Sequence, residues 1–312
     1  MLFRSGIRTG TKCAALDETG KFLDYFLINQ ETKPEEAKKA IATSVKKFNI
    51  EIIAVGNGTA SHEVQAVVAA SIEENGLICK FTAVDEDGAS VYSASDLARE
   101  EFPELDLTVR GAISIGRRLQ DPLAELVKID PKSIGVGLYQ HDVNQKKLTE
   151  RLDEVVGSVV NKVGVNLNTA SYAILKYVSG INMGLAKKIV KFREEKGTIG
   201  SRSMLIDIPG MGAKTFEQCA GFLKIPESPD ELDNTWVHPE NYALAAEILG
   251  FIKAGADPSK EQRGALKEKY QVGDTTLDDI IVELKKPNRD PREDLPPPIL
   301  QKGVLKFEDL QE

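Results

Sequence analysis

The stretch from Val178 to Lys224 constrains this chain most, because it repeats one pattern: a short helix, a tight glycine-containing turn and a second helix. The first turn is Ser179-Gly180-Ile181-Asn182-Met183-Gly184. The second, about thirty residues later, is Ile208-Pro209-Gly210-Met211-Gly212-Ala213-Lys214. Glycine allows a positive φ and the close approach of another backbone. A single glycine turn is weak evidence, but two in tandem predict a pair of related helical hairpins.

Such turns predict an anion site, because they leave backbone N–H groups pointing out of the positive end of the next helix. The pattern resembles the helix-hairpin-helix module, which in its family holds a nucleic-acid phosphate at the turn without reading bases. The predicted nucleic-acid-binding residues are Gly180, Asn182, Gly184, Lys187, Lys188, Gly210, Met211, Gly212 and Lys214. The apolar positions Leu185, Ile189 and Phe192 are interpreted as core residues.

The charge distribution is consistent with this interpretation. The 312-residue chain has a net charge of −8, which by itself argues against a nucleic-acid partner. Residues 174–224, however, carry nine Lys/Arg against four Asp/Glu, a balance of +5. A basic segment in an acidic chain localises a contact surface for phosphates, although an ordinary solvated face would give the same count.

Composition excludes several classes of protein. No window approaches the roughly 20 apolar residues of a membrane span, and no signal peptide is recognisable, so a cytoplasmic location is expected. Cys13, Cys79 and Cys219 are scattered, which suggests neither a disulfide framework nor a zinc site. No small-molecule substrate is indicated.

The first part of the chain predicts an α/β domain. Two strands around residues 11–16 and 22–28 are joined by a tight turn, and a helix over 34–48 begins at Pro34. A buried strand at 52–58, a helix at 61–75 and a strand at 78–84 follow. The order β-β-β-α-β-α-β-α is that of the ribonuclease-H-like fold.

Several segments resemble the bacterial transcription accessory protein Tex family, and the likeness extends over nearly the whole chain. They are Gly6–Gly10, Gly56–Ser61, Gly88–Ser93, Arg117–Leu126, Ile134–Val143 and Val165–Ser171. The resemblance implies an RNase H-like YqgF domain followed by all-α helix-hairpin-helix and helical domains. It also implies binding of RNA or DNA, single strands included, and a role in transcription. The chain is expected to lack the family's N-terminal helical region and to stop before its S1 domain.

Hydrolysis of a phosphodiester on this fold needs clustered carboxylates that hold divalent ions. The family pattern places the first of them in Asp-Pro-Gly, where this chain has Arg4-Ser5-Gly6, and a guanidinium there would repel Mg²⁺. The remaining catalytic candidates are Glu63, Asp85, Glu86 and Asp87, for which solvated acidic loops are the favoured interpretation. A degenerate site and a truncated one give the same triplet. The sequence therefore predicts no metal site and no cofactor, with Mg²⁺ needed only if the YqgF domain is active.

Other features are interpreted more simply. Arg117 and Arg118 are expected to be exposed on a helix, either as ordinary surface residues or as a secondary phosphate contact. A helix over 148–163 has an apolar stripe that is expected to pack against the hairpins. His141 and Asp142 are expected in a structural turn, and Trp236 is expected to pack rather than stack on a base.

The predicted domains are 1–127 (YqgF/RNase H-like), 128–228 (tandem helix-hairpin-helix), 229–286 (small helical domain) and 287–312 (a proline-rich linker). Helices are expected at 239–253 and 276–285 in the small domain. Three functions are open at this point: a non-catalytic, sequence-independent nucleic-acid-binding module, a metal-dependent resolvase-like nuclease, and a docking scaffold for RNA polymerase. The first is favoured.

Overall fold

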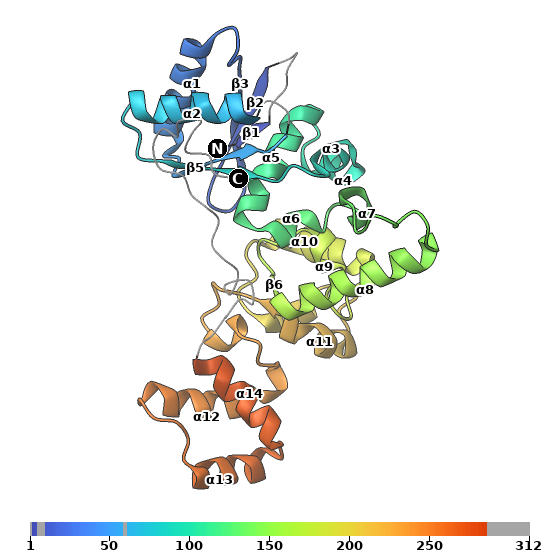
Figure 1. The fold of residues 1–312 in the computed structure, drawn as a ribbon. Helices are drawn as coiled ribbons and strands as arrows, with labels where there is room; N and C mark the ends of the chain where they lie inside the picture. Colours follow the sequence, from blue (N-terminus) through green and yellow to red (C-terminus); the bar gives the residue numbers. More distant parts are fainter. Residues whose placement is uncertain (1, 5–9, 59–60, 286–312) are drawn as a thin grey trace. The chain divides into compact units, whose positions relative to one another are not determined.

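A computed structural model describes residues 2–4, 10–58 and 61–285 (Figure 1). Within these ranges one compact unit ends at Val143 and a second begins at Asn144. The predicted linker at 287–312, the segment Ser5–Thr9 and the side chain of Arg4 lie outside the described residues. In the described ranges, no helix is long and apolar enough to cross a membrane.

The first unit is built on a mixed sheet, in which the described residues form five strands in the order β3-β2-β1-β4-β5. The strands are β1 (Leu2–Arg4), β2 (Thr11–Leu16), β3 (Phe22–Ile28), β4 (Ile52–Gly56) and β5 (Lys80–Val84). β1, β2 and β3 are antiparallel neighbours, whereas β1, β4 and β5 run parallel. This confirms the predicted ribonuclease-H-like arrangement.

Alternation along β2 divides the core between the two faces of the sheet, because successive side chains point to opposite sides. Cys13 and Ala15 face the layer of α1 (Pro34–Phe48) and α2 (Ser61–Glu74). Ala14 and Leu16 face α3 (Ala89–Ala94) and α5 (Leu107–Gln120). Figure 1 shows α1 and α2 together beside the sheet.

The helices that close this unit begin at clear capping residues. Ser95 caps α4 (Asp96–Glu101), and the Asp106 carboxylate accepts hydrogen bonds from two amides at the start of α5. Pro122 and Pro131 open α6 (Pro122–Leu126) and α7 (Pro131–Ile134), where a missing N–H costs nothing.

The tight turn that contains His141 and Asp142 is present, held by hydrogen bonds from Gln140 N to Gly137 O and from Asp142 N to Tyr139 O.

The second unit begins with α8 (Gln145–Val163), which leads into the hairpin region. The elements are β6 (Val165–Asn166), α9 (Tyr172–Leu175), α10 (Met183–Lys196), the 3-10 helix η1 (Arg202–Asp207), α11 (Ala213–Cys219), η2 (Ala220–Phe222) and β7 (Leu223–Lys224). β6 pairs with β7 in parallel. The expectation that the α8 stripe is buried is wrong for most of its length: only Val160 and Val163 are buried in α8, and Val155 is 60% exposed.

The same unit continues through η3 (Glu231–Asn234) and η4 (Pro239–Asn241) into α12 (Tyr242–Lys253), α13 (Lys260–Tyr270) and α14 (Asp274–Lys285). These helices share a core of Leu244, Ile248, Leu266, Leu277 and Ile281. The sequence predicted α12 and α14 but not α13, whose polar sequence KEQRGALKEKY buries only Leu266.

Candidate nucleic-acid interface

The two predicted turns have the same backbone geometry, thirty residues apart in the numbering. In the first, the amide of Ile181 donates to the carbonyl of Val178 across Gly180, whose φ is +80°. In the second, the amide of Met211 donates to the carbonyl of Ile208 across Gly210, whose φ is +99°. Each turn is then followed by one extended residue, Asn182 or Gly212, that begins the next helix. The tandem pattern therefore corresponds to a real structural repeat.

The four glycines have different roles. Gly180 and Gly210 need their positive φ values, which other residues rarely adopt. Gly184 lies inside the first turn of α10, and Gly212 precedes α11 with a φ of −81°. Other residues adopt these conformations without strain, so neither position requires glycine. A Cβ added to Gly212 would meet no heavy atom within 4 Å. The turn needs glycine at Gly180 and Gly210, whereas position 212 tolerates substitution.

Each turn packs against the helix of the other hairpin. A Cβ placed on Gly180 would lie 3.3 Å from the carbonyl oxygen of Thr215 and 2.9 Å from Cβ of Gln218, both on α11. A Cβ placed on Gly210 would lie 3.3 Å from Nζ of Lys188 and 4.0 Å from Cδ1 of Leu185, both on α10. Leu185 and Lys188 correspond to Thr215 and Gln218 when the first hairpin is shifted by thirty residues. The two hairpins therefore contact each other with approximate twofold symmetry.

The amides at the start of both helices face solvent. The Asn182 side chain accepts a hydrogen bond from Leu185 N, so this one amide of α10 is satisfied internally. In the part of the chain that the structure describes, no group accepts from the amides of Met183, Gly184, Ala213 or Lys214. These residues are exposed. The geometry can therefore offer several donors to an external anion.

The predicted side chains divide into exposed and buried groups. Lys187, Lys188 and Lys214 are exposed, and Nζ of Lys187 lies 4.7 Å from the ring centroid of Tyr172. Met211 is 5% exposed and its sulfur contacts Cys219 Sγ, so its side chain is part of the core. Met211 can therefore contribute to a phosphate site only through its backbone.

Part of the basic segment is internal, which corrects the charge count. Arg202 is 1% exposed, and Lys224 is buried with Nζ 4.5 Å from the Trp236 ring centroid. Arg193 is partly buried and donates to the carbonyls of Leu167 and Ala170. The balance of +5 therefore overstates the charge on the surface, where the lysines on α10 and at the start of α11 remain.

Arg202 instead ties the hairpins to the segment that follows them. Its guanidinium donates to the carbonyls of Leu223, Thr235 and Val237 and to the Tyr242 hydroxyl. Tyr242 in turn donates to Asp233, whose other oxygen accepts from the Arg202 amide. Burial raises the pKa of Tyr242, against the opposing effect of the Arg202 charge, so the hydroxyl stays protonated. Trp236 packs edge-on against Phe222 beside this network, as predicted.

The starts of α13 and α14 differ from those of α10 and α11. The start of α13 is closed by a capping box, in which the Ser259 and Gln262 side chains satisfy each other's backbone amides. The first turn of α14 carries Asp274, which would repel an anion and is paired with Lys267. This contrast separates the two turns of the tandem repeat from the starts of α13 and α14.

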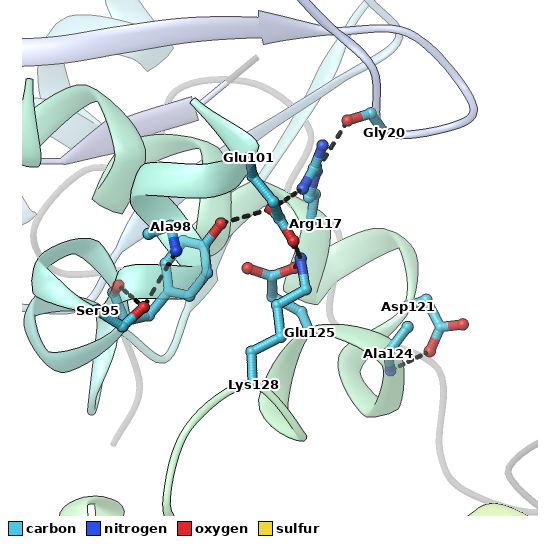
Figure 2. Close-up of polar contacts among 10 residues, drawn as sticks. Gly20, Ser95, Ala98, Glu101, Arg117, Asp121, Ala124, Glu125 and Lys128 are labelled. Atoms are coloured by element: carbon cyan, nitrogen blue, oxygen red, sulfur yellow. Dashed lines mark hydrogen bonds and ion pairs between the residues drawn. The ribbon is translucent and has the colours of Figure 1, made fainter. Parts of the chain in front are cut away.

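Arg117 and Arg118 are not exposed as the sequence suggested. Figure 2 shows the Arg117 guanidinium between Glu101 and the Gly20 carbonyl, to which it donates at 2.9 and 2.8 Å. Arg118 is 6% exposed and donates to the carbonyls of Asp85 and Asp87. Both arginines therefore stabilise the first unit and present little surface to a phosphate.

Glu101 and Lys128 are the centre of a buried ionic network that the sequence did not reveal (Figure 2). Nζ of Lys128 lies 2.9 Å from Glu101 and 2.8 Å from Glu125, and its side chain is 4% exposed. Burial alone would raise the pKa of Glu101, but the charges of Lys128 and Arg117 outweigh it and hold that pKa below its ordinary value. Tyr92 donates to the same carboxylate.

The catalytic candidates come from two elements of the first unit. Glu63 is exposed on α2, whereas Asp85, Glu86 and Asp87 lie in the loop after β5. Asp85 accepts from the Asp87 amide, and Glu86 lies against Gly56 and Gly58. Over the described ranges, no group of three His, Cys, Asp or Glu side chains could hold a metal ion. The structure thus does not bring these carboxylates together as a two-metal site requires.

The chain thus combines a ribonuclease-H-like unit with a repeat of glycine turns between helices, and comparisons with known proteins match both parts. Residues 1–120 match the Tex protein YqgF-like domain, 160–224 the helix-hairpin-helix motif, and 230–292 an HHH domain. The chain is 48% identical to Protein tex of Bordetella pertussis and 45% identical to transcriptional accessory protein Tex of Neisseria gonorrhoeae. It is 34% identical to human S1 RNA-binding domain-containing protein 1.

Each of these alignments includes 98% of this chain but only 40%, 41% and 38% of the respective relative. The chain therefore belongs to the Tex family, and it spans about two fifths of the length of the relatives it matches. The predicted family, the α/β domain and the following helix-hairpin-helix region are confirmed.

Proposed function

We propose that this chain binds nucleic acid without sequence preference, by donating main-chain hydrogen bonds to backbone phosphates at the Gly180 and Gly210 turns. The observation that carries the proposal is the repeated turn geometry with exposed amides at Met183, Gly184, Ala213 and Lys214. Backbone amides contact phosphate oxygens whatever base is attached, which is why no sequence readout is expected.

Lys188 and Lys214 add the long-range attraction. Both are exposed, and Lys188 reaches from α10 to the second turn, where its ammonium lies beside Gly210. Neutralising phosphates releases counterions from the nucleic acid, so affinity should fall as salt rises. We also propose a role in transcription, because the Neisseria gonorrhoeae relative is named transcriptional accessory protein Tex.

Fluorescence anisotropy with two unrelated single-stranded RNA probes and their DNA counterparts, at several salt concentrations, tests this function. Equal affinity for the two sequences is expected, with log K falling by about 0.7 per neutralised phosphate for each unit of log salt. The double variant Lys188→Ala, Lys214→Ala should reduce that slope by about 0.7 for each phosphate contact it removes.

Lys33→Ala, Lys46→Ala is a control that removes the same charge from the exposed surface of the first unit. It should leave the slope unchanged. A slope that is identical in wild type and in the Lys188, Lys214 variant would show that these lysines contact no phosphate.

A further inference from the structure

The two turns share a backbone geometry but differ in the side chains that face them. Lys188 faces the second turn, with Nζ 3.3 Å from the position of a Cβ on Gly210. Its counterpart in the thirty-residue register, Gln218, faces the first turn, with Oε1 3.2 Å from the position of a Cβ on Gly180. An ammonium at one turn is therefore replaced by a neutral amide at the other.

Neighbouring positions extend this difference. Lys187 corresponds to Glu217, and Lys214, in the first turn of α11, corresponds to Gly184 in the first turn of α10. All four positions are exposed. The second turn thus has lysines on its own helix and on the facing helix, whereas the helix that faces the first turn carries a carboxylate and an amide.

Symmetry connects this difference to the number of strands that can be held. The two strands of a duplex are antiparallel and related by local twofold axes, which symmetric proteins match with two equivalent contacts. The approximate twofold symmetry of the hairpins would allow such a match if both turns attracted phosphate equally. Because phosphate contacts by lysine supply most non-specific affinity, removing the cations from one turn weakens the second contact selectively.

We propose that Glu217 and Gln218 restrict the hairpin pair to one nucleic-acid strand, which is held mainly at the Gly210 turn. This inference rests on the proposed function and adds the residues that set its strand specificity. It makes positions 217 and 218 determinants of specificity, although their side chains need not touch the bound strand.

The test is to give the first turn the charges of the second. The variant Glu217→Lys, Gln218→Lys reproduces the Lys187-Lys188 pair at two exposed helical positions, so the fold should tolerate it. The variant Glu194→Lys, Thr198→Lys is a matched control, since it adds the same net charge at exposed positions near the end of α10. Each protein, as the full 312-residue chain, is titrated with a single-stranded DNA and with the duplex of the same sequence.

Wild type should prefer the single strand. Glu217→Lys, Gln218→Lys should raise duplex affinity about tenfold relative to single-strand affinity, with a duplex salt slope steeper by about 0.9 per added phosphate. The matched control should raise both affinities in the same proportion. An unchanged duplex-to-single-strand ratio in the Glu217, Gln218 variant would overturn the inference while leaving the proposed function intact. Failure of wild type to bind any probe at low salt would overturn both.

Discussion

Replacing Arg202 by leucine is expected to lower the free energy of unfolding of the second unit by about 3–5 kcal/mol, because it leaves buried polar groups without a partner. The carbonyls of Leu223, Thr235 and Val237 would lose their donor. Tyr242 would lose the charge that it contacts. Trp236 is the sole tryptophan of the chain and stands in sequence between Thr235 and Val237. Its fluorescence during urea denaturation therefore reports on this region.

Two variants make the Arg202 result specific. Arg202→Lys keeps a charge but cannot reproduce the planar set of donors, so an intermediate loss is expected. Arg263→Leu changes the same residue type where it forms an exposed ion pair with Asp278, and it should cost less than about 1 kcal/mol. Equal losses for Arg202→Leu and Arg263→Leu would contradict the assigned role of the buried guanidinium.

Replacing Lys128 by methionine should destabilise the first unit by a similar amount, about 3–5 kcal/mol, because it removes the buried ammonium that pairs with both Glu101 and Glu125. Glu101 would retain Arg117, but Glu125 would lose the ammonium that lies 2.8 Å from it and keep only the more distant attraction of Arg118. Glu125 is 2% exposed, so its charge would have no access to water. Hydrogen exchange of the amides in α5 and α6 should then become faster in the variant.

Lys33→Met is the matched control, because Lys33 forms an exposed ion pair with Glu36 and its loss should have little effect. The double variant Lys128→Met, Glu125→Gln should recover part of the stability, since it removes the buried charge that has lost its ion-pair partner. Exchange rates that are unchanged in Lys128→Met would contradict the role of the network.

The fold of the first unit could be predicted because its signals are local. The turn at Thr19-Gly20-Lys21 and Pro34 at the start of α1 each specify an element without reference to distant residues. The helix α13 was missed because its sequence is polar, and one buried leucine produces no clear apolar periodicity.

The turns of the candidate site were predictable for the same reason, since glycine at a required positive φ is visible in sequence. The locations of the arginines were not. Arg202 and Arg118 obtain their partners from carbonyl groups up to 35 residues away, and sequence shows residue types but not which carbonyls lack donors. Counting charges therefore assigned to the surface several cations that the fold uses internally.

The central claim, that the turns bind phosphate through exposed amides, is tested most directly at Gly212. Aspartate is a favourable residue at a helix start and has room at this position, so Gly212→Asp should fold normally. Gly210 is unsuitable, because aspartate at a φ of +99° would add backbone strain. Gly212→Ala is the control, since it adds a side chain without a charge.

The deciding measurement is the affinity of Gly212→Asp and Gly212→Ala for one single-stranded RNA at low salt. We expect Gly212→Ala to bind like wild type and Gly212→Asp to bind at least about tenfold more weakly, because a carboxylate there caps the amides of α11 and repels phosphate. A folded Gly212→Asp protein that binds as tightly as Gly212→Ala, with the same salt dependence, would contradict the claim.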